Sequence, residues 1–300
     1  MAVAAATLAL LLGLALPEWS PLTPAPVDGY PVPAEANAFW KMVTSLGATI
    51  YGEPNEATGE LLKLYKPESG VNPEELGEYT QGDILFTNKG NALSRNGLKA
   101  ASARWPGAVV PFEISYGFSP SDRQMILNAM EEYHKHTCIR FVPRRGTDYD
   151  YLYITNGNSG CWSSVGRVGG RQEVNLQSPG CLTKIGTPMH ELMHAMGFMH
   201  EQNRWERDDY VTINWQHIQS GRNNNFDKAD ASMTDGQGVN YDYRSVMHYS
   251  AKAFSRDGSD TITPRGYSGD LGQRDGFSAG DIKKLQSMYK CVGGKTMLQD

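Results

Sequence analysis

Three histidines between residues 190 and 200 constrain this chain more than any other feature. His190 and His194 are four residues apart, so on a helix they project from one face. Two neutral imidazoles in that arrangement can bind one Zn²⁺. Gly197 accepts a left-handed turn that ends the helix and brings His200 round as a third ligand. Three protein ligands leave one position open for water, which is typical of a catalytic rather than a structural zinc.

Glu191 follows the first of these histidines, where its carboxylate can reach a metal-bound water without binding the metal. Thr187 and Pro188 predict the start of the helix, as N-cap and first helical residue. The helix should be short and largely buried, which makes it a rigid platform for two ligands. The alternative is an amphipathic core helix with incidental histidines, but the added spacing of Gly197 and His200 rarely arises by chance.

The residues after this motif carry a family resemblance. The chain continues EQNRWERDDYV from residue 201, and residues 245–249 read SVMHY. Together they resemble the astacin family of metzincin metalloendopeptidases, whose pattern is HExxHxxGFxHEQxRxDRDxYV followed by SxMHY. The resemblance extends from about Trp105 to Cys291, and Glu206 stands where the family usually has Asp. It implies an α+β catalytic domain of two lobes, with a mixed twisted sheet, helices, and zinc in the cleft between the lobes.

The resemblance also implies the chemistry. The implied ligands of one zinc ion per subunit are His190, His194 and His200. Glu191 would act as general base and then general acid in the hydrolysis of internal peptide bonds. Tyr249 would ligate the metal in the resting enzyme and then swing away to bind the transition state; the alternative is a core tyrosine. Met247 would pack beneath the metal without binding it.

Two residues are candidates for substrate binding. Trp162 lies in the strand expected over residues 161–167, which resembles the rim where family members pair antiparallel with an extended substrate. Arg265 stands where relatives that prefer an acidic residue just after the scissile bond have a basic one; the alternative is a solvated loop arginine. The remaining histidines, which we interpret as structural, are His134, His136, His217 and His248.

Composition and the N-terminal residues indicate a secreted protein. The chain has 28 Lys and Arg against 33 Asp and Glu, a net charge of −5, so it has no basic footprint for nucleic acid. Residues 3–16 form an apolar run too short to span a bilayer comfortably. We interpret residues 1–17 as a signal peptide, with a short membrane anchor as the alternative. The sequence has no second run of spanning length, so no membrane span is expected after signal removal.

Four cysteines behind a signal peptide indicate two disulfides. The sequence alone allows three pairings, and it has no CxxC spacing that would favour cysteine ligation of zinc. The family resemblance selects Cys138–Cys291 and Cys161–Cys181. The chain has no N-x-S/T sequon, so no N-glycan is expected.

The residues between the signal and the catalytic domain have the composition of a propeptide. Residues 53–82 are polar and acidic, with Gly and Pro throughout, and could not form an independent core. The expected organisation is a propeptide over 18–95, a catalytic domain over 96–291 and a short tail over 292–300.

Asp83 is the candidate inhibitory residue of that propeptide. Gly82-Asp83 resembles the family's FxGD motif, although Thr80 replaces the phenylalanine. The resemblance implies that Asp83 occupies the open zinc position and displaces the catalytic water. The alternative is an ordinary Gly-Asp turn.

Patterning predicts the remaining elements. Strands are expected over residues 108–114, 139–142, 151–154, 166–168 and 173–176. Helices are expected from Ser119-Pro120 to about His136 and from Ser278, where Asp281 completes a capping box, to about Tyr289.

The alternatives to a secreted zinc endopeptidase are a non-catalytic binding module and an exopeptidase. A non-catalytic binding module on a protease fold would be expected to lack a ligand or the base, and none is missing here. An exopeptidase would need a charge cluster that binds a chain terminus, which the sequence does not indicate.

The mature enzyme is predicted to begin at Asn96, because Arg95 ends a polar site suited to an activating trypsin-like protease. Its freed α-amino group would be buried against Glu201, since a buried ammonium needs an acidic partner. The rival cleavage site follows Lys89. N-terminal sequencing of the active secreted form tests this, and a start at Gly90 would contradict both the site and the Glu201 pairing.

Overall fold

The structure is a computed structural model that describes residues 51–87, 103–229, 231 and 235–291. The expected signal peptide, the Arg95–Asn96 cleavage site and the tail over 292–300 lie outside these residues. Within the described part of the chain, no helix is both long enough and apolar enough to cross a membrane.

Five strands form a mixed sheet in the order β2–β1–β3–β5–β4. They are β1 (Val109–Ile114), β2 (Arg140–Pro143), β3 (Tyr151–Thr155), β4 (Cys161–Ser163) and β5 (Arg171–Leu176). The first four in this order run parallel, and β4 joins β5 antiparallel at one edge. Branched side chains such as Val110, Leu152 and Val174 suit strands and are fully buried here. The edge strand β4 and its neighbour β5 pack against the histidine-bearing helix.

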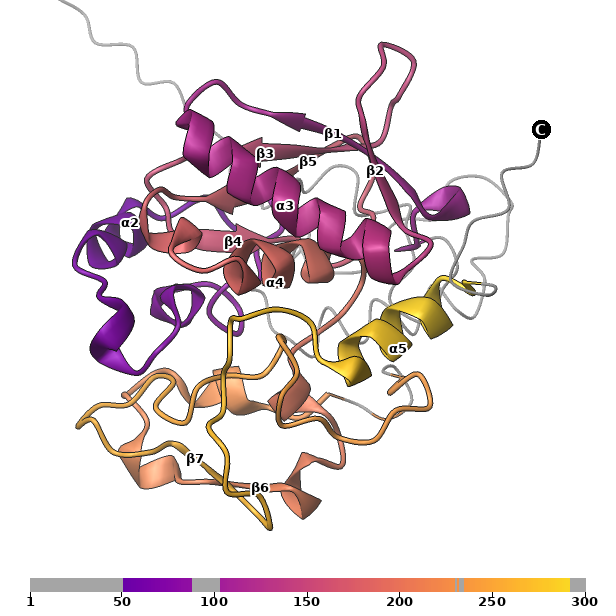
Figure 1. Ribbon diagram of the computed structural model, residues 1–300. Coiled ribbons are helices and arrows are strands. Elements are labelled where there is room, and N and C mark those ends of the chain that lie inside the picture. The colour runs from indigo at the N-terminus through magenta and orange to yellow at the C-terminus, as the bar shows by residue number, and fades with distance from the viewer. Residues whose placement is uncertain (1–50, 88–102, 230, 232–234, 292–300) are drawn as a thin grey trace, which may run out of the picture. The chain divides into compact units, whose positions relative to one another are not determined.

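Two helices pack against this sheet (Figure 1), α3 (Pro120–His136) and α4 (Gly186–Ala195). The predicted start of α3 is confirmed: the Ser119 side chain accepts from Asp122 N, and Asp122 accepts from Ser119 N. Helix α3 packs against β2 and α4, while α4 packs against β4 and β5. The histidine helix is therefore held between the sheet and α3, and all ten of its residues are buried.

The chain after α4 is mostly irregular and has a second hydrophobic cluster, in which Phe226, Tyr241 and Tyr249 are buried. Two short strands, β6 (Val211–Ile213) and β7 (Ile262–Pro264), pair antiparallel there. Helix α5 (Ala279–Met288) follows, capped by Ser278 and Asp281 as predicted. The 3-10 helices are η2 (Pro67–Ser69), η3 (Pro73–Leu76), η6 (Pro106–Ala108), η7 (Gly180–Leu182), η8 (Glu201–Asn203), η9 (Arg207–Asp209), η10 (Trp215–His217) and η11 (Asn223–Phe226).

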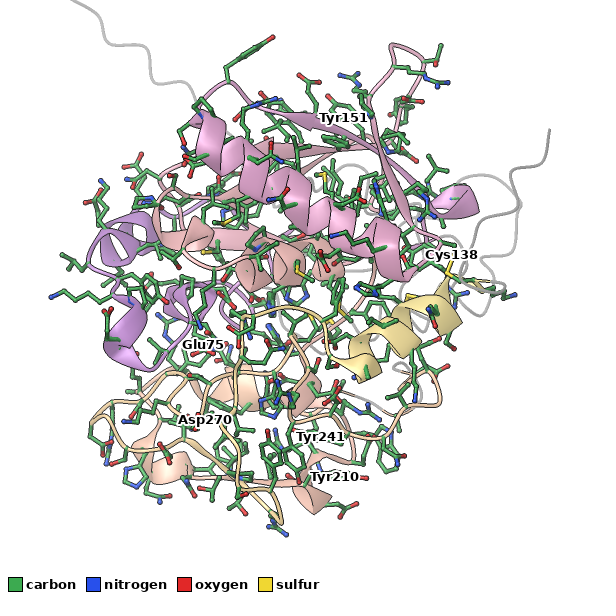
Figure 2. All side chains as sticks on the ribbon, viewed as in Figure 1. Glu75, Cys138, Tyr151, Tyr210, Tyr241 and Asp270 are labelled. Carbon is green, nitrogen blue, oxygen red and sulfur yellow. A yellow bond between two sulfur atoms is a disulfide. The ribbon has the colours of Figure 1, made fainter. Side chains whose placement is uncertain are left out.

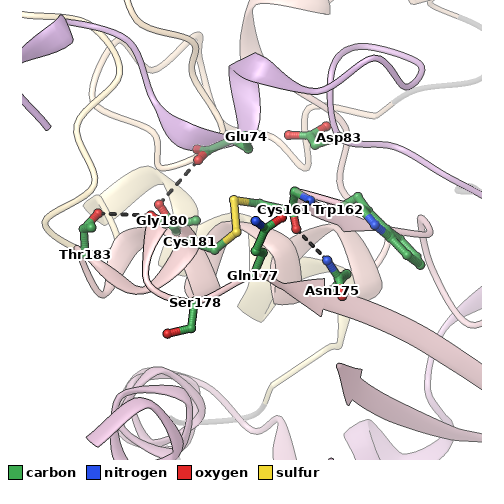
Figure 3. The surroundings of a disulfide bond; sticks show 12 residues. Glu74, Asp83, Cys161, Trp162, Asn175, Gln177, Ser178, Gly180, Cys181 and Thr183 are labelled. Carbon is green, nitrogen blue, oxygen red and sulfur yellow. Dashed lines mark hydrogen bonds between the residues drawn. A yellow bond between two sulfur atoms is a disulfide. The ribbon is translucent and has the colours of Figure 1, made fainter. Parts of the chain in front are cut away.

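Two disulfides join elements that are distant in sequence, and they are the pairs that the family resemblance selects. Cys138, labelled in Figure 2, is bonded to Cys291 and ties the end of α3 to the end of α5. Cys161 is bonded to Cys181 and ties β4 to η7, just before α4 (Figure 3). The second bond therefore fixes the edge strand relative to the start of the histidine helix.

Residues 51–87 pack on the rest of the described chain. Helix α2 (Glu56–Lys63) begins at Asn55, whose side chain accepts from Ala57 N. Leu62 of α2 is buried against Gly180, where an added Cβ would lie 2.6 Å from the Leu62 Cγ. Gln177 Nε2 donates to Gly59 O over 3.0 Å. Leu62 and the Gln177 contact thus attach segment 51–87 to the rest of the described chain.

Three predictions of local structure were wrong. Residues 166–168 form no strand, because Gly166 and the following Gly169 and Gly170 all have positive φ, which interrupts an extended chain. Helix α4 begins earlier than expected, with Ile185 as its cap residue and Thr187 inside the helix. The strand expected over 161–167 is confined to β4.

Loss of the longer-range disulfide should destabilise the protein more. Cys138 and Cys291 are 153 residues apart and Cys161 and Cys181 are 20 apart. Chain entropy then predicts losses in the free energy of unfolding of about 5 and about 3 kcal/mol when each pair is changed to serine. Urea denaturation of the two double variants measures both values. Equal losses, or the reverse order, would contradict this ranking.

Candidate active site

Helix α4 and the turn after it bring the three histidines together. His190 and His194 project from one face of α4, and Gly197, with φ of 108°, turns the chain so that His200 meets them. The imidazole centroids are 4.7 Å apart for His190–His194, 4.7 Å for His194–His200 and 5.2 Å for His190–His200. All three side chains are buried.

The hydrogen bonds of the Nδ1 atoms fix the orientation of each ring. His190 Nδ1 donates to Val246 O over 2.8 Å, and His194 Nδ1 donates to Phe198 O over 2.7 Å. His200 Nδ1 donates to the amide oxygen of Gln81 over 2.9 Å. Because each of these oxygens can only accept, each Nδ1 carries the proton and each Nε2 presents a lone pair.

The three Nε2 atoms face the carboxylate of Asp83. Asp83 Oδ2 lies 2.9 Å from His190 Nε2 and 3.1 Å from His200 Nε2, and its Oδ1 lies 3.4 Å from His194 Nε2. The four ligand atoms lie within 4.8 Å of one another. Four lone-pair donors around one buried point repel one another unless a cation lies between them. This donor set, three imidazoles and one carboxylate, fits Zn²⁺.

Burial keeps the imidazoles of His190 and His200 neutral. It lowers the pKa of His190, with the Arg274 charge acting in the same direction, and it lowers the pKa of His200 to about 3. Neutral rings keep the Nε2 lone pairs available, so the site is prepared for a metal at neutral pH.

Glu191 lies beside the cluster without joining it. Both of its carboxyl oxygens are buried and have no hydrogen-bond partner among the described residues. Burial, and next the charge of Asp83, raises the pKa of Glu191 well above its usual value. A carboxyl group with a raised pKa and no protein partner is suited to exchange a proton with a small molecule at the site.

Tyr249 and Met247 come from the SVMHY turn, which lies against the cluster. The Tyr249 ring centroid is 4.6 Å from that of His200, and its hydroxyl donates to Gln81 O over 2.5 Å. Met247 is buried in the core, and its carbonyl accepts from Glu201 N. The turn itself is held by Asp281, which accepts from Ser245 Oγ and Val246 N.

Residues 83–85 form a short parallel ladder with β4. Ser163 N donates to Asp83 O over 2.9 Å, and Leu85 N donates to Ser163 O over 3.0 Å. Beside this ladder, Trp162 is covered by Tyr79 and Leu85, with the two aromatic rings edge to face. Asp83 and Trp162 both lie near the Cys161–Cys181 bond in Figure 3.

Two adjacent glutamates of η3 bind residues of the 245–275 region. Glu74 and Arg274 form a fully buried ion pair. Glu75 (labelled in Figure 2) accepts from Ser250 N and Ser250 Oγ, each over 2.6 Å. Burial raises the pKa of Glu75 to about 7. These contacts place two acidic side chains of segment 51–87 next to the SVMHY turn.

The side chains of Arg265 and Glu201 are hydrogen-bonded to residues other than the three histidines and Asp83. Arg265 is exposed just after β7, and its Nε donates to Thr212 Oγ1 over 3.0 Å. Glu201 is buried and already bound by Lys284, Arg204 and the backbone N–H of Asp242. Selection of acidic residues by Arg265 and pairing of Glu201 with a freed amino group remain predictions.

The comparisons with known proteins agree with this geometry. Residues 97–290 match the family model for Astacin, a peptidase family, and the chain belongs to this family. It is 44% identical over 223 residues to zinc metalloproteinase nas-13 of Caenorhabditis elegans, which covers 74% of this chain and 48% of nas-13. Its identity to nas-4 of the same organism is 41% over 226 residues, covering 73% of this chain and 71% of nas-4. The chain thus spans about half the length of relatives such as nas-13.

A solved structure shares the fold. High choriolytic enzyme 1, a hatching enzyme zinc-protease from Oryzias latipes, aligns with a TM-score of 0.58 and 37% identity, over 69% of this chain and 99% of that chain. The predicted family, its α+β fold and zinc as the cofactor are therefore confirmed.

Sequence reasoning missed the polar residues that surround the cluster. Gln81 contacts both His200 and Tyr249, yet only its place beside Gly82-Asp83 could have drawn attention to it. Glu74 and Arg274 are 200 residues apart, and nothing in either local pattern indicates that they pair.

Replacing His194 with alanine should remove zinc as well as activity, because two imidazoles bind Zn²⁺ far more weakly than three. Metal analysis should find about one zinc per chain in the wild type and well below about 0.2 in His194→Ala. His217→Ala is the matched control, since His217 is half-exposed and pairs with Asp257. A full zinc complement in His194→Ala would rule out the ligand assignment.

Proposed function

We propose that this chain is a secreted zinc endopeptidase made as a zymogen, with His190, His194 and His200 as the metal ligands. The observation that carries the proposal is the convergence of three Nε2 lone pairs on one buried point, with an unpartnered glutamate beside it. Zn²⁺ bound there supplies a Lewis acid that polarises the substrate carbonyl and acidifies the attacking water.

The chain's own residues would perform the remaining steps. Glu191 takes a proton from the attacking water and passes it to the leaving amine, as its raised pKa favours. The Tyr249 hydroxyl donates to the oxyanion that develops on the substrate carbonyl. The substrate would extend along β4 by backbone pairing, near Trp162, with selectivity supplied by side-chain pockets. Arg265 is a candidate for selecting acidic residues after the scissile bond.

Segment 51–87 is proposed to be the inhibitory part of a propeptide over 18–95. Asp83 would hold the coordination position that the attacking water needs. The ladder of residues 83–85 runs parallel to β4, opposite to the antiparallel direction proposed for a substrate. A chain in that direction does not present a peptide bond correctly to Glu191 and Tyr249.

Maturation would remove this segment. A signal peptide over 1–17, an activating trypsin-like protease acting after Arg95, and a catalytic domain over 96–291 complete the proposal. The two disulfides are consistent with an extracellular location. The amino group of Asn96 would have to share Glu201 with Lys284, which already binds it. Protein or peptide substrates are the expected partners.

Glu191→Gln tests the proposed base. The amide keeps the size of the side chain but cannot take a proton, so the activated variant should retain zinc and lose peptide cleavage. Cleavage of a quenched fluorescent peptide, together with metal analysis, gives both readouts. Turnover above about a hundredth of the wild-type value would contradict the assigned role.

The low activity expected of the uncleaved chain should depend on Glu74 as well as on Asp83. In an uncleavable Arg95→Ala chain, Glu74→Gln leaves Arg274 without its charge partner in the closed state. The cost of about 3 kcal/mol should raise the open, active population by about a hundredfold. Asp83→Ala should also raise activity, and the double variant should exceed either single change.

The matched control for this experiment is Glu68→Gln, which changes an exposed glutamate of the same segment. Residual activity of the uncleaved chains is the measurement. Activity in Glu74→Gln no higher than in the control would show that the Glu74–Arg274 pair does not maintain latency.

A further inference from the structure

The backbone of Tyr249 is held from two sides. Its N–H donates to the side-chain oxygen of Gln202 over 3.0 Å, and Gln202 is fully buried two residues after His200. Its carbonyl accepts from Nδ1 of His248 over 2.8 Å. Both polar backbone atoms of this residue are therefore bound to side chains of the 103–291 region, and neither partner belongs to segment 51–87.

The second of these bonds determines the tautomer of His248. A carbonyl oxygen can only accept, so His248 Nδ1 carries the proton and Nε2 presents a lone pair. Tyr241 satisfies that lone pair, because its hydroxyl lies 2.7 Å from His248 Nε2 and must donate to it. The result is a buried relay from Tyr241 through His248 to the Tyr249 carbonyl, outside the metal cluster.

The outer end of this relay is fixed by aromatic packing. The Tyr241 ring is stacked on Tyr210 at 4.8 Å between centroids and 7° between planes. It also meets Tyr243 at 5.3 Å and His248 at 5.6 Å, both in edge-to-face contact. Figure 2 shows Tyr210 and Tyr241 close together in the part of the molecule that also contains β6 and β7. Packing of this kind leaves the Tyr241 hydroxyl few positions other than the one it occupies.

The side chain of Tyr249 is held differently from its backbone. Among the described residues, its hydroxyl is hydrogen-bonded to Gln81 O, which belongs to segment 51–87. Removal of that segment takes away the partner of the hydroxyl but none of the partners of the backbone. Removal of the segment also takes away Glu75, which binds the N–H of the next residue, Ser250, so Gln202 and His248 are the side chains left to hold the Tyr249 backbone when the phenol is released.

We propose that Tyr241 and His248 are positioning residues, which hold the Tyr249 backbone so that its phenol reaches the developing oxyanion. This inference rests on the proposed peptidase function and adds two residues that do not touch the substrate. His248, interpreted as structural from the sequence, would then hold the Tyr249 carbonyl in place. A displacement of about 1 Å at a catalytic group can cost about a hundredfold in rate, so a fixed backbone has a direct consequence for turnover.

A double-mutant cycle on the activated enzyme tests the proposal. Tyr249→Phe alone should lower kcat by about a hundredfold with KM nearly unchanged, since it removes one oxyanion donor. His248→Leu alone should lower kcat by about tenfold, with KM unchanged. If His248 acts through the Tyr249 phenol, the same leucine change in the Tyr249→Phe background should cost less than about twofold.

Two conservative variants separate positioning from folding. His248→Asn keeps a short N–H donor near the Tyr249 carbonyl and should recover most of the lost kcat. Tyr241→Phe keeps the stacked ring but removes the donor to His248, and should lower kcat by about tenfold. Tyr243→Phe is the matched control, because its hydroxyl donates to Tyr210 O and Arg265 O instead, and it should leave kcat unchanged.

A binding measurement gives a readout besides activity. A phosphinic peptide resembles the tetrahedral transition state, so calorimetry should show weaker binding to Tyr241→Phe and His248→Leu. Binding of an uncleaved product peptide and the zinc content should stay at wild-type values. An inactive wild type would refute the proposed function itself. An active wild type with a strong Tyr249→Phe defect, but additive His248→Leu losses or a wild-type Tyr241→Phe, would overturn this inference.

Discussion

The geometry of this site depends on which nitrogen of each of the three imidazoles carries the proton. Val246 O, Phe198 O and the Gln81 amide oxygen each take an Nδ1 proton, so all three Nε2 lone pairs converge with a carboxylate on one buried point. Such an arrangement is electrostatically unfavourable without a cation. The acceptors come from the SVMHY turn, the turn after α4 and segment 51–87. The metal site is therefore assembled by three segments that meet only in the folded chain.

Segment 51–87 supplies two of the side chains at this cluster. Gln81 orients one ligand and binds the Tyr249 hydroxyl, and Asp83 occupies the centre of the cluster. Farther away, the buried Glu74–Arg274 pair and the contacts of α2 attach the segment to the domain. The attachment of the segment therefore does not depend on Asp83 alone, because these contacts lie outside the cluster.

The sequence predicted the parts of this protein that depend on local pattern. The spacing of His190, His194 and His200 requires a helix and a glycine turn, and the capping residues of α3 and α5 indicate where those helices begin. Long-range polar pairs gave no such signal, since Glu74–Arg274 and Tyr241–His248 depend on the tertiary fold. Residues 166–168 are a different case: Val168 resembles a strand residue, but the glycines on both sides have positive φ, which interrupts an extended chain.

The most direct test of the central claim is a crystal structure of the zinc-loaded, uncleaved chain with anomalous diffraction recorded at the zinc edge. We expect one anomalous peak, from a zinc ion bonded to Nε2 of all three histidines at about 2.0–2.1 Å, with a carboxylate oxygen of Asp83 as a further ligand. A peak at another place, or zinc on the three histidines with Asp83 pointing away and water in its position, would contradict it.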